Sequence, residues 1–262
     1  MERHPTAALS PLACEALCIA AGTRSLVQDL TFALERGEFL AVLGRNGCGK
    51  SLTLHALAGL AMPHGGRVLL DGTDMRQLTR RHIAQRLGLL PQDREESLSM
   101  TALESVIVGR HPHLGLWQRE SASDVAIAGD ALARLGLTGQ AGRLVPTLSG
   151  GEQRRVAMAG LLAQSPQIYL LDEPSNHLDP LHQIQVLSLF RDLASRGASV
   201  IATLHDPTLA DRFADRVLLL YGDGRHRIGS VAEMLSEDLL SELYITPMRV
   251  LGTAPRRAFV PA

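Results

Sequence analysis

A glycine-rich run that ends in lysine and serine carries the clearest chemical signal in this sequence. It matches the pattern G-x-x-x-x-G-K-[ST] over Gly44, Arg45, Asn46, Gly47, Cys48, Gly49, Lys50 and Ser51. Glycines let main-chain N–H groups surround phosphate oxygens at the start of a helix, where the helix dipole favours anions. A lysine ammonium can reach the β- and γ-phosphates of a nucleotide, and a serine hydroxyl can bind Mg²⁺. The run therefore predicts a nucleotide phosphate loop.

Lys50 is set apart by composition as well as by position. The chain has 26 lysine and arginine residues, and Lys50 is the only lysine among them. Arginine presents a planar fork, whereas lysine presents a compact charge that fits closely against a phosphate oxygen. We therefore expect Lys50 to contact the phosphates. The alternative interpretation of the run is a glycine-rich turn that precedes a helix by chance.

Two neighbouring acids, Asp172 and Glu173, follow the apolar run 168–171. Ligands of wound parallel sheets bind at the carboxyl ends of the strands, so these acids are predicted to lie near the phosphates. Asp172 is suited to hold Mg²⁺ through water, and Glu173 is suited to orient and deprotonate an attacking water molecule. Without the phosphate loop, a strand that ends in two acids would equally indicate a solvated turn.

A second pair of glycines, Gly150 and Gly151, lies between Ser149 and Glu152. Ser149 and Glu152 have the spacing of a capping box, which predicts the N-terminus of a helix. Each glycine disfavours a helix by about 1 kcal/mol relative to alanine, so the pair indicates a further use. Bare N–H groups at a helix N-terminus can bind an anion. We expect both roles, the cap and a second phosphate contact.

The elements that must position these residues alternate between strands and helices. Apolar runs predict strands over 38–43, 167–171, 199–204 and 216–221, and helical patterns follow over 50–60, 181–196 and 207–214. Nearly continuous apolar strands followed by helices indicate a parallel sheet that is covered on both faces. Residues 30–34 and 67–70 are predicted to be antiparallel strands at the sheet edge. The fold class is therefore α/β, a wound sheet with antiparallel edge strands.

Between residues 93 and 164, helical periodicity replaces the strand pattern. Helices are predicted over 102–110, 123–135 and 152–162. We interpret 93–164 as a helical subdomain inserted into an α/β core that comprises 1–92 and 165–222. The C-terminal part, 223–262, is predicted to hold one helix over 231–244 and two short extended segments near Arg249 and Phe259.

Taken in order along the chain, these motifs resemble the ATP-binding cassette of ABC transporters, a P-loop NTPase-type fold with an inserted helical subdomain. The resemblance extends from Leu17 to Tyr244, and a Leu-Ser-Gly-Gly-Glu run after a phosphate loop is highly specific to that family. It implies ATP and Mg²⁺ as cofactors and ATP hydrolysis coupled to transport across a membrane.

The resemblance also implies roles for individual residues. Gln92 is similar to a glutamine that contacts Mg²⁺ and senses the membrane partner, and His205 to a histidine that holds the γ-phosphate and the attacking water. Asp179 is similar to a residue at the dimer interface. The signature that contacts the γ-phosphate of the opposite subunit is matched by Ser149, Gly150, Gly151 and Glu152. The expected catalytic residues are Lys50, Glu173 and His205, and the expected metal ligands are Ser51, Gln92 and Asp172.

The sequence departs from the family pattern at two positions. Ala21 stands where the family usually has an aromatic residue that stacks on adenine. Because such stacking is worth about 1–3 kcal/mol, we expect weaker nucleotide affinity and poorer discrimination of ATP from GTP. Cys48 stands where a smaller residue is commoner. A thiol close to main-chain amides and to Lys50 is expected to have a depressed pKa, so that its alkylation blocks hydrolysis and MgATP protects it.

Partners are also implied by the resemblance. The family forms a head-to-tail homodimer with two ATP molecules between phosphate loop and signature, and it works with two transmembrane permease subunits. The stretch 108–115 and the ending after Leu240 resemble importers of iron chelates, haem and cobalamin, which are fed by a periplasmic substrate-binding protein. No apolar run approaches the ~18 residues that cross a bilayer, and the polar N-terminus is a poor secretory signal. We expect a cytoplasmic protein held on the inner face of the membrane by its permease.

Composition disfavours other classes of function. The net charge of −1 gives no attraction to nucleic acid, and three cysteines suit a reducing compartment. His111 and His113 invite a metal site, but the other ligands that such a site needs are missing. A GTPase is disfavoured because no Asn-Lys-x-Asp base-reading motif is present. The remaining alternative is a soluble ABC ATPase scaffold, for example in iron–sulfur assembly, without a membrane partner.

Overall fold

A six-stranded sheet forms the centre of the molecule, in the strand order β10-β9-β3-β8-β7-β6. The computed structural model describes residues 10–92, 99–115, 118–176, 178–253 and 257–262. The six strands are β3 (Phe39–Gly44), β6 (Leu87–Leu90), β7 (Ile168–Leu171), β8 (Ser199–Thr203), β9 (Arg216–Leu220) and β10 (His226–Ser230). Neighbouring strands are parallel except β9 and β10, which are antiparallel. The four strands predicted from apolar runs are thus confirmed.

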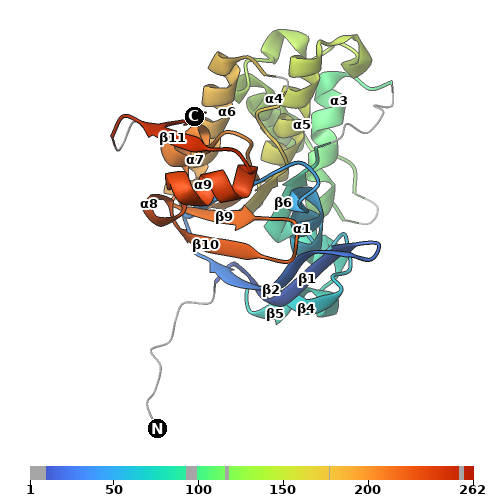
Figure 1. The fold of residues 1–262 in the computed structure, drawn as a ribbon. Coiled ribbons are helices and arrows are strands. Elements are labelled where there is room, and N and C mark those ends of the chain that lie inside the picture. Colours follow the sequence, from blue (N-terminus) through green and yellow to red (C-terminus); the bar gives the residue numbers. More distant parts are fainter. Residues whose placement is uncertain (1–9, 93–98, 116–117, 177, 254–256) are drawn as a thin grey trace.

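A second, antiparallel sheet lies below the first in Figure 1, in the order β2-β1-β4-β5. Its strands are β1 (Leu12–Ala21), β2 (Arg24–Leu34), β4 (Gly65–Leu70) and β5 (Thr73–Asp74). The two strands predicted at 30–34 and 67–70 are antiparallel, as expected. They do not lie at the edge of the central sheet, however, but belong to this separate sheet, where each pairs with β1. The two sheets meet at the turn between β9 and β10, where the N–H of Gln28 in β2 donates to the carbonyl of Gly224 at 2.9 Å.

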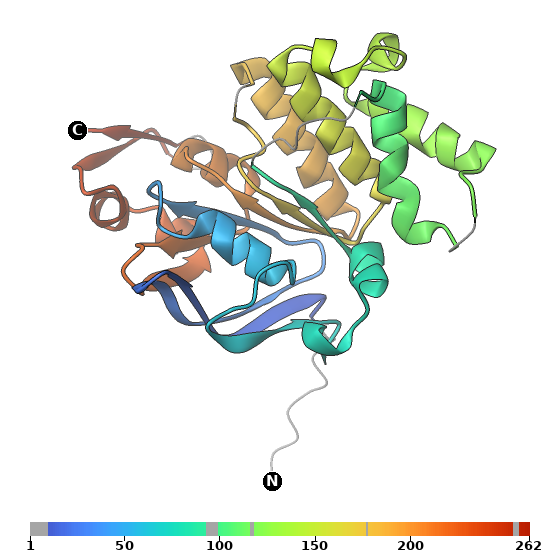
Figure 2. The same cartoon turned by 90° about the vertical axis from the view of Figure 1, so that its right-hand side faces the viewer.

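Helices cover both faces of the central sheet. The helices α1 (Lys50–Leu57), α6 (Pro180–Ser195) and α7 (Pro207–Phe213) follow β3, β7 and β8, as predicted. Figure 2 shows α1 between the two sheets, and α2 (Arg80–Arg86) leads into β6. The side chains of β3 alternate between the two layers: Phe39 and Leu43 pack in the cluster that contains α6, and Leu40 and Val42 in the cluster that contains α1. The phosphate loop therefore starts from a strand that is buried on both faces.

A group of helices occupies the upper part of the molecule in Figures 1 and 2. It contains α3 (Ala102–Ile107), α4 (Ala122–Arg134) and α5 (Gly150–Gln164), with short 3-10 turns at Val108–His113, Thr138–Gln140 and Val145–Thr147; a further 3-10 turn, Met75–Gln77, follows β5. Arg110 ties the group together, because its guanidinium bonds to Asp124 on α4 and to the carbonyl of Ala163 on α5. The three helices expected in this part of the chain are confirmed. The predicted domain boundary at Asp93 lies outside the described residues.

The C-terminal part contains two helices where the sequence predicted one. They are α8 (Val231–Met234) and α9 (Glu237–Tyr244). The predicted continuous helix is wrong because Ser236 has an extended backbone and caps α9, its side chain accepting from the N–H of Leu239. The two predicted extended segments are confirmed as β11 (Met248–Leu251) and β12 (Ala258–Pro261), which pair as an antiparallel hairpin.

Strands β1, β6 and β10 and the two-residue strand β5 were not predicted, for different physical reasons. In β1 the register shifts between Cys14 and Leu17, and Ala16 has a φ of +47°, so an irregularity breaks the alternation that marks a strand. β6 has only four residues, and β10 is an edge strand with a polar sequence. Short or irregular strands leave a weak local pattern.

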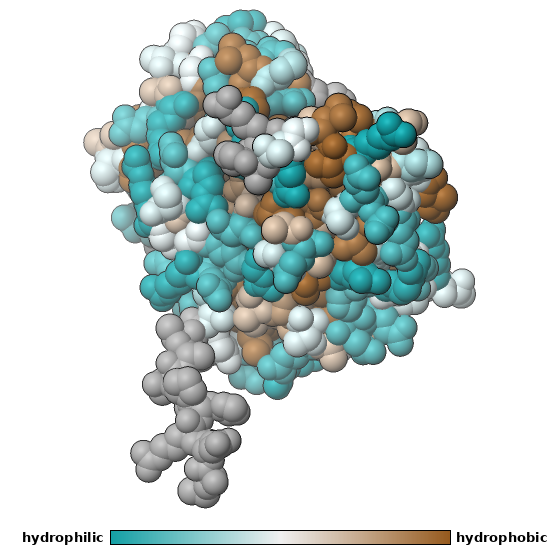
Figure 3. Space-filling view, turned by 60° about the vertical axis from the view of Figure 1, so that its left-hand side comes forward, coloured by the Kyte–Doolittle hydropathy of each residue, from teal (hydrophilic) through white to brown (hydrophobic). Residues whose placement is uncertain are grey.

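The surface is mostly hydrophilic on the face drawn in Figure 3, with hydrophobic residues in several separate patches. Among the described residues, the large apolar side chains that are exposed include Leu60, Met62, Leu181, Ile245 and Leu251. Within the described part of the chain, no helix combines the length and the apolar character that a membrane span requires.

Candidate functional site

The phosphate loop runs from the end of β3 to the start of α1 and needs glycine at its turns. Gly47 and Gly49 have φ values of +73° and +105°, a region that side chains other than glycine rarely adopt. A Cβ atom added at Gly44 would lie 2.5 Å from Sγ of Cys48 and 2.5 Å from the carbonyl oxygen of Leu220. Gly49 occupies the N-cap position of α1 without a capping side chain. The predicted loop is thus formed, and it leads into the N-terminus of α1, the end of a helix that favours an anion.

Lys50 is the first residue of α1 and is 5% exposed. Its Nζ atom donates to the carbonyl oxygens of Gly44 at 2.8 Å and of Arg45 at 3.3 Å. The ammonium group is therefore held over the loop by main-chain oxygens. A cation in this place stands beside the same N–H groups that would receive a phosphate.

A cavity of about 490 Å³ opens beside the loop. This volume falls in the range of small-ligand sites, roughly 300–1,000 Å³. The residues that line it are Ala21, Leu26, Asn46, Gly47, Gly49, Lys50, Ser51, Leu52, Gln92, Glu173, Asn176 and His205. The structure thus brings Gln92, Glu173 and His205, which are far apart in the sequence, to the predicted phosphate loop. Ser51 and Gln92 also contact each other, the hydroxyl lying 3.3 Å from Oε1 of the amide.

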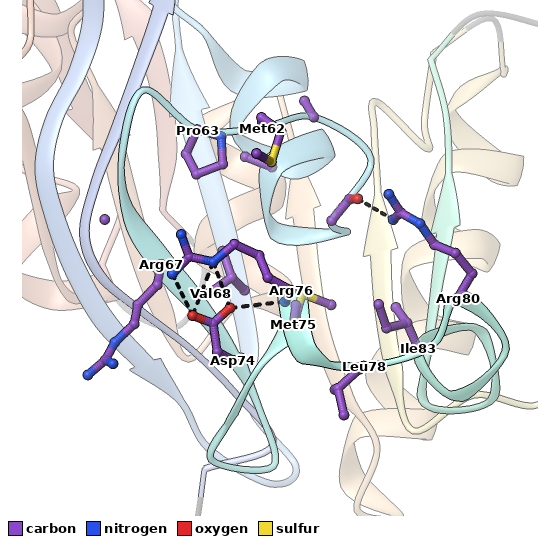
Figure 4. Close-up of a pocket in the computed structure, with 14 residues that line it drawn as sticks. Met62, Pro63, Arg67, Val68, Asp74, Met75, Arg76, Leu78, Arg80 and Ile83 are labelled. Carbon is purple, nitrogen blue, oxygen red and sulfur yellow. Dashed lines mark hydrogen bonds and ion pairs between the residues drawn. The ribbon is translucent and has the colours of Figure 1, made fainter.

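A second pocket, between α1, β4 and α2, is too small and too apolar to compete as the nucleotide site (Figure 4). Its volume is about 150 Å³, and side chains such as Met62, Val68 and Ile83 line it. The carboxylate of Asp74 is bonded to Arg76, and Arg80 donates to the carbonyl of Gly59. Asp74 is the one carboxylate among the residues that Figure 4 labels, and its ion pair with Arg76 makes it a poor base.

Asp172 and Glu173 follow β7 and are held by a residue that the sequence analysis missed. The hydroxyl of Thr203, at the end of β8, donates to Oδ1 of Asp172 at 2.7 Å and accepts from the N–H of Glu173 at 2.8 Å. All three residues are buried. The only available sequence signal was a hydroxyl at the end of a mostly apolar strand.

The second oxygen of Asp172 fits a metal ion. Oδ2 is buried and has no hydrogen-bond partner among the described residues, which leaves an acceptor free to face a cation or its water shell. Ser51 and Gln92 add neutral oxygens, and oxygen donors are what Mg²⁺ prefers. In the described part of the chain, no three His, Cys, Asp or Glu side chains cluster as a metal site. A magnesium ion here would therefore depend on the nucleotide phosphates for most of its ligands.

The carboxylate of Glu173 is held at both oxygens. Nε2 of His205 lies 2.6 Å from Oε1, and the amide of Asn176 donates to Oε2. Glu173 also has a φ of +48°, in the left-handed region, which is uncommon for a residue with a side chain. Strain of this kind concentrates at functional sites. The sequence analysis gave Asn176 no role.

Arg154, on α5, connects the helical group to both strand ends beside the cavity. Its guanidinium donates to the carbonyl oxygens of Pro91, Gln92, Asp172 and Glu173. The side chain is 4% exposed. The sequence analysis assigned no role to Arg154, because a basic residue on a helix usually indicates a solvated face.

The predicted signature residues and Asp179 do not line the cavity of their own chain. Ser149 caps α5 in a capping box with Glu152, as predicted, and the N–H and hydroxyl of Ser149 hold the pKa of Glu152 below its usual value. Gly150 and Gly151 form the first turn of α5. Asp179 caps α6 and accepts from the N–H of His182, which lowers the pKa of Asp179.

The expected depressed pKa of Cys48 is wrong. Cys48 is 2% exposed, and burial raises the pKa of its thiol even though the charge of Lys50 acts in the opposite direction. Desolvation of the thiolate outweighs the attraction of the nearby cation. Ala21, by contrast, is exposed and lines the cavity, as its predicted position beside the nucleotide requires.

The histidines of the 3-10 turn at Val108–His113 stand apart from each other in their contacts. His113 Nε2 bonds to the carbonyl of Gln164 at 2.8 Å, and His111 lies 3.9 Å from Glu120 at the surface. The two histidines therefore have different surroundings, His113 bonded to the main chain at the end of α5 and His111 at the surface.

The family model for ABC transporters matches residues 27–176. A hemin import ATP-binding protein of Pseudomonas aeruginosa is 41% identical over 88% of this chain and 91% of its own length. A cobalamin import ATP-binding protein of Halobacterium salinarum is 39% identical over 90% of this chain, which spans only 58% of that relative.

Among solved structures, an inward-facing metal-chelate type ABC transporter contains a chain that is 31% identical to this one. The TM-score is 0.83, and the match covers 97% of this chain and 98% of the other. Fold, motif order and sequence identity therefore agree over almost the entire length. The chain belongs to the ABC transporter family.

Proposed function

We propose that this chain binds ATP with Mg²⁺ and hydrolyses it to power the uptake of a metal chelate through a separate permease. The observation that supports this most directly is the cavity in which Lys50, Glu173 and His205 meet. A cation for phosphate, a buried carboxylate for water and an imidazole bonded to that carboxylate are the groups that phosphoanhydride hydrolysis needs.

The proposed roles follow from the contacts. The loop N–H groups and Lys50 bind the β- and γ-phosphates. Glu173 orients and deprotonates the attacking water, with His205 and Asn176 fixing its two oxygens. Ser51, Gln92 and Asp172 would hold Mg²⁺, which neutralises charge on the phosphates when it is bound.

A second copy of the chain completes the site in this proposal. The signature and Asp179 lie outside the cavity of their own chain, although the signature forms the N-terminus of α5, the end of a helix that favours an anion. Cassettes of this family dimerise. A head-to-tail homodimer places the signature of one chain over the phosphate loop of the other, with ATP between them.

The cargo we propose is an iron–siderophore, haem or cobalamin. The relatives that support it are named as importers of hemin and cobalamin, and the structural neighbour as a metal-chelate transporter. Two permease subunits and a periplasmic substrate-binding protein would complete the importer, with this chain on the inner face of the membrane. The alternative, an ABC ATPase scaffold in iron–sulfur assembly, has no observation of its own in support.

ATP hydrolysis is tested with the purified chain and two variants. Lys50→Ala should lose nucleotide binding, and Glu173→Gln should keep binding but lose hydrolysis by roughly 10²-fold or more, the usual contribution of a general base. Glu15→Gln is the matched control, because Glu15 pairs with Arg67 on the surface away from the cavity. Normal hydrolysis in Lys50→Ala and Glu173→Gln would disprove the assignment.

Transport is tested by co-expression with any permease that proves to be encoded beside this gene. Co-purification of the two from detergent supports the importer, whereas a chain recovered without any membrane protein supports the scaffold. Proteoliposomes that contain the complex are then given labelled haem, ferric siderophore or cobalamin. ATP-dependent uptake of one of them, abolished by Glu173→Gln, identifies the cargo.

A further inference from the structure

The C-terminal segment contacts the loop that carries His205. Tyr244, the last residue of α9, donates from its hydroxyl to the main-chain oxygen of His205 at 3.2 Å. The imidazole of the same histidine lies 2.6 Å from Oε1 of Glu173. His205 is therefore held through its main chain by Tyr244 and through its side chain by the proposed catalytic acid.

The helix that presents Tyr244 is firmly anchored. Leu240 and Leu243 are 0% and 2% exposed, and in a helix they share one face with Tyr244. The hairpin that follows also bonds to α9, since the N–H of Met248 donates to the hydroxyl of Ser241 at 2.8 Å. Because α9 is anchored in this way, the hydrogen bond from Tyr244 restrains the main chain of His205 more than a hydrogen bond from a mobile chain end would.

The same segment also holds α7, the helix that begins two residues after His205. The N–H of Phe259 in β12 donates to the hydroxyl of Thr208 at 3.3 Å, and Arg257 forms an ion pair with Asp211. Figure 1 shows α9 and β11 beside α7. The C-terminal segment thus contacts both the His205 loop and the helix into which this loop leads.

The hydroxyl of Tyr244 is suited to remain a donor. Burial raises its pKa, and the nearby charge of Asp206 raises it further, so the group stays protonated under all conditions in which the protein would work. The direction of the hydrogen bond to a carbonyl oxygen is then fixed.

We propose that Tyr244 is a positioning residue for ATP hydrolysis, which sets the place of the His205 imidazole relative to Glu173 and the reacting phosphate. The inference rests on the proposed function. Catalysis depends on placement so steeply that a shift of about 1 Å can cost roughly 10²-fold in rate. The C-terminal segment, for which the sequence indicated only a helix and two extended pieces, then takes part in the chemistry.

The test compares Tyr244→Phe with a matched control in steady-state ATP hydrolysis. Tyr244→Phe keeps the ring and removes only the hydroxyl, and kcat should fall roughly threefold to tenfold with KM for ATP unchanged, the effect of one lost hydrogen bond. The control is Tyr221→Phe, because among the described residues the hydroxyl of Tyr221 bonds only to the exposed Glu242, at 3.5 Å. Its kcat should stay within about twofold of the parent.

A double mutant separates positioning from general stability. In a His205→Ala background, Tyr244→Phe should cause no further loss of kcat, because it acts through the missing imidazole. An equal loss in both backgrounds, or an unchanged kcat in Tyr244→Phe alone, overturns the inference and leaves the proposed function intact.

Hydrogen exchange provides a readout that needs no activity. Tyr244→Phe should speed amide exchange at residues 204–209 and leave β1 unchanged. Unchanged exchange at 204–209 overturns the inference. If the parent itself fails to hydrolyse ATP, the proposed function fails, and the exchange result still decides whether Tyr244 restrains the loop.

Discussion

The hydroxyl of Thr203 donates to Oδ1 of Asp172 at 2.7 Å, and this hydroxyl also accepts a hydrogen bond from the N–H of Glu173. A single side chain on β8 therefore fixes both acids at the end of β7. Their placement relative to the phosphate loop depends on this contact between neighbouring strands, which the sequence does not reveal.

Thr203→Val should destabilise the fold, because valine has nearly the same shape but leaves two buried groups without partners. We expect the free energy of unfolding to fall by about 1–3 kcal/mol. Thr53→Val is the matched control: Thr53 is equally buried, and its hydroxyl has no hydrogen-bond partner among the described residues. The control should be neutral or stabilising in urea unfolding. Equal losses in both variants would contradict the role given to Thr203.

Arg154→Lys should weaken the link between α5 and the two strand ends. A lysine ammonium cannot donate to carbonyl groups on two separate segments as the planar guanidinium does. We expect a loss of about 1.5–3 kcal/mol in unfolding free energy, the cost of hydrogen bonds made by a charged group. Arg225→Lys, at a site where the side chain is 60% exposed, should change stability by less than about 0.5 kcal/mol. The prediction fails if the two variants behave alike.

Ala21→Tyr should tighten nucleotide binding. Ala21 lines the cavity and is exposed, so a ring at this position has room to stack on the base. Stacking of about 1.4 kcal/mol would improve the affinity for ATP roughly tenfold. Thr23→Tyr is the control, because Thr23 is exposed in the same turn but does not line the cavity. Titration with ATP and GTP measures both the affinity and the discrimination, and equal affinities for parent and Ala21→Tyr would refute the prediction.

Alkylating reagents should label Cys18 and spare Cys48 in the folded protein. Cys18 is partly exposed, whereas Cys48 is buried with a raised thiol pKa and Cys14 is buried with a pKa raised to about 12. Only the thiolate reacts, so both burial and the raised pKa protect Cys48. Mass spectrometry after brief labelling should find one modified cysteine, and labelling in urea should find three. Rapid labelling of Cys48 in the native protein would rule out its buried position.

Asp124 should contribute to stability only while it is ionised. Hydrogen bonds from Ser121, and then from Arg110, lower the pKa of this carboxyl to about 2 from its ordinary 3.8. Because the folded pKa lies below the unfolded one, the contribution is complete above the ordinary value and is lost as pH falls towards the folded pKa. Asp124→Asn should therefore have a lower free energy of unfolding than the parent at pH about 7. This difference in free energy should become smaller below pH about 4. A gap that stays constant with pH would exclude this ionic contribution.

The sequence alone determined the phosphate loop and the strands that lead to the site. Lys50 and the glycines form a local pattern whose geometry is set by neighbouring residues, and the loop is formed as predicted. The strands β3, β7, β8 and β9 are apolar on both faces, which leaves a strong continuous signal. The capping box at Ser149 is local as well and was also correct.

The tertiary structure decided the environment of each of these groups. Arg154 meets the carbonyl of Pro91 across 63 residues, and Tyr244 meets His205 across 39. The pKa of Cys48 was misjudged because the sequence shows the neighbouring Lys50 but not the burial that outweighs it. Local patterns report which groups are adjacent along the chain, whereas desolvation and hydrogen bonding depend on which segments pack against one another, and only the folded chain determines that.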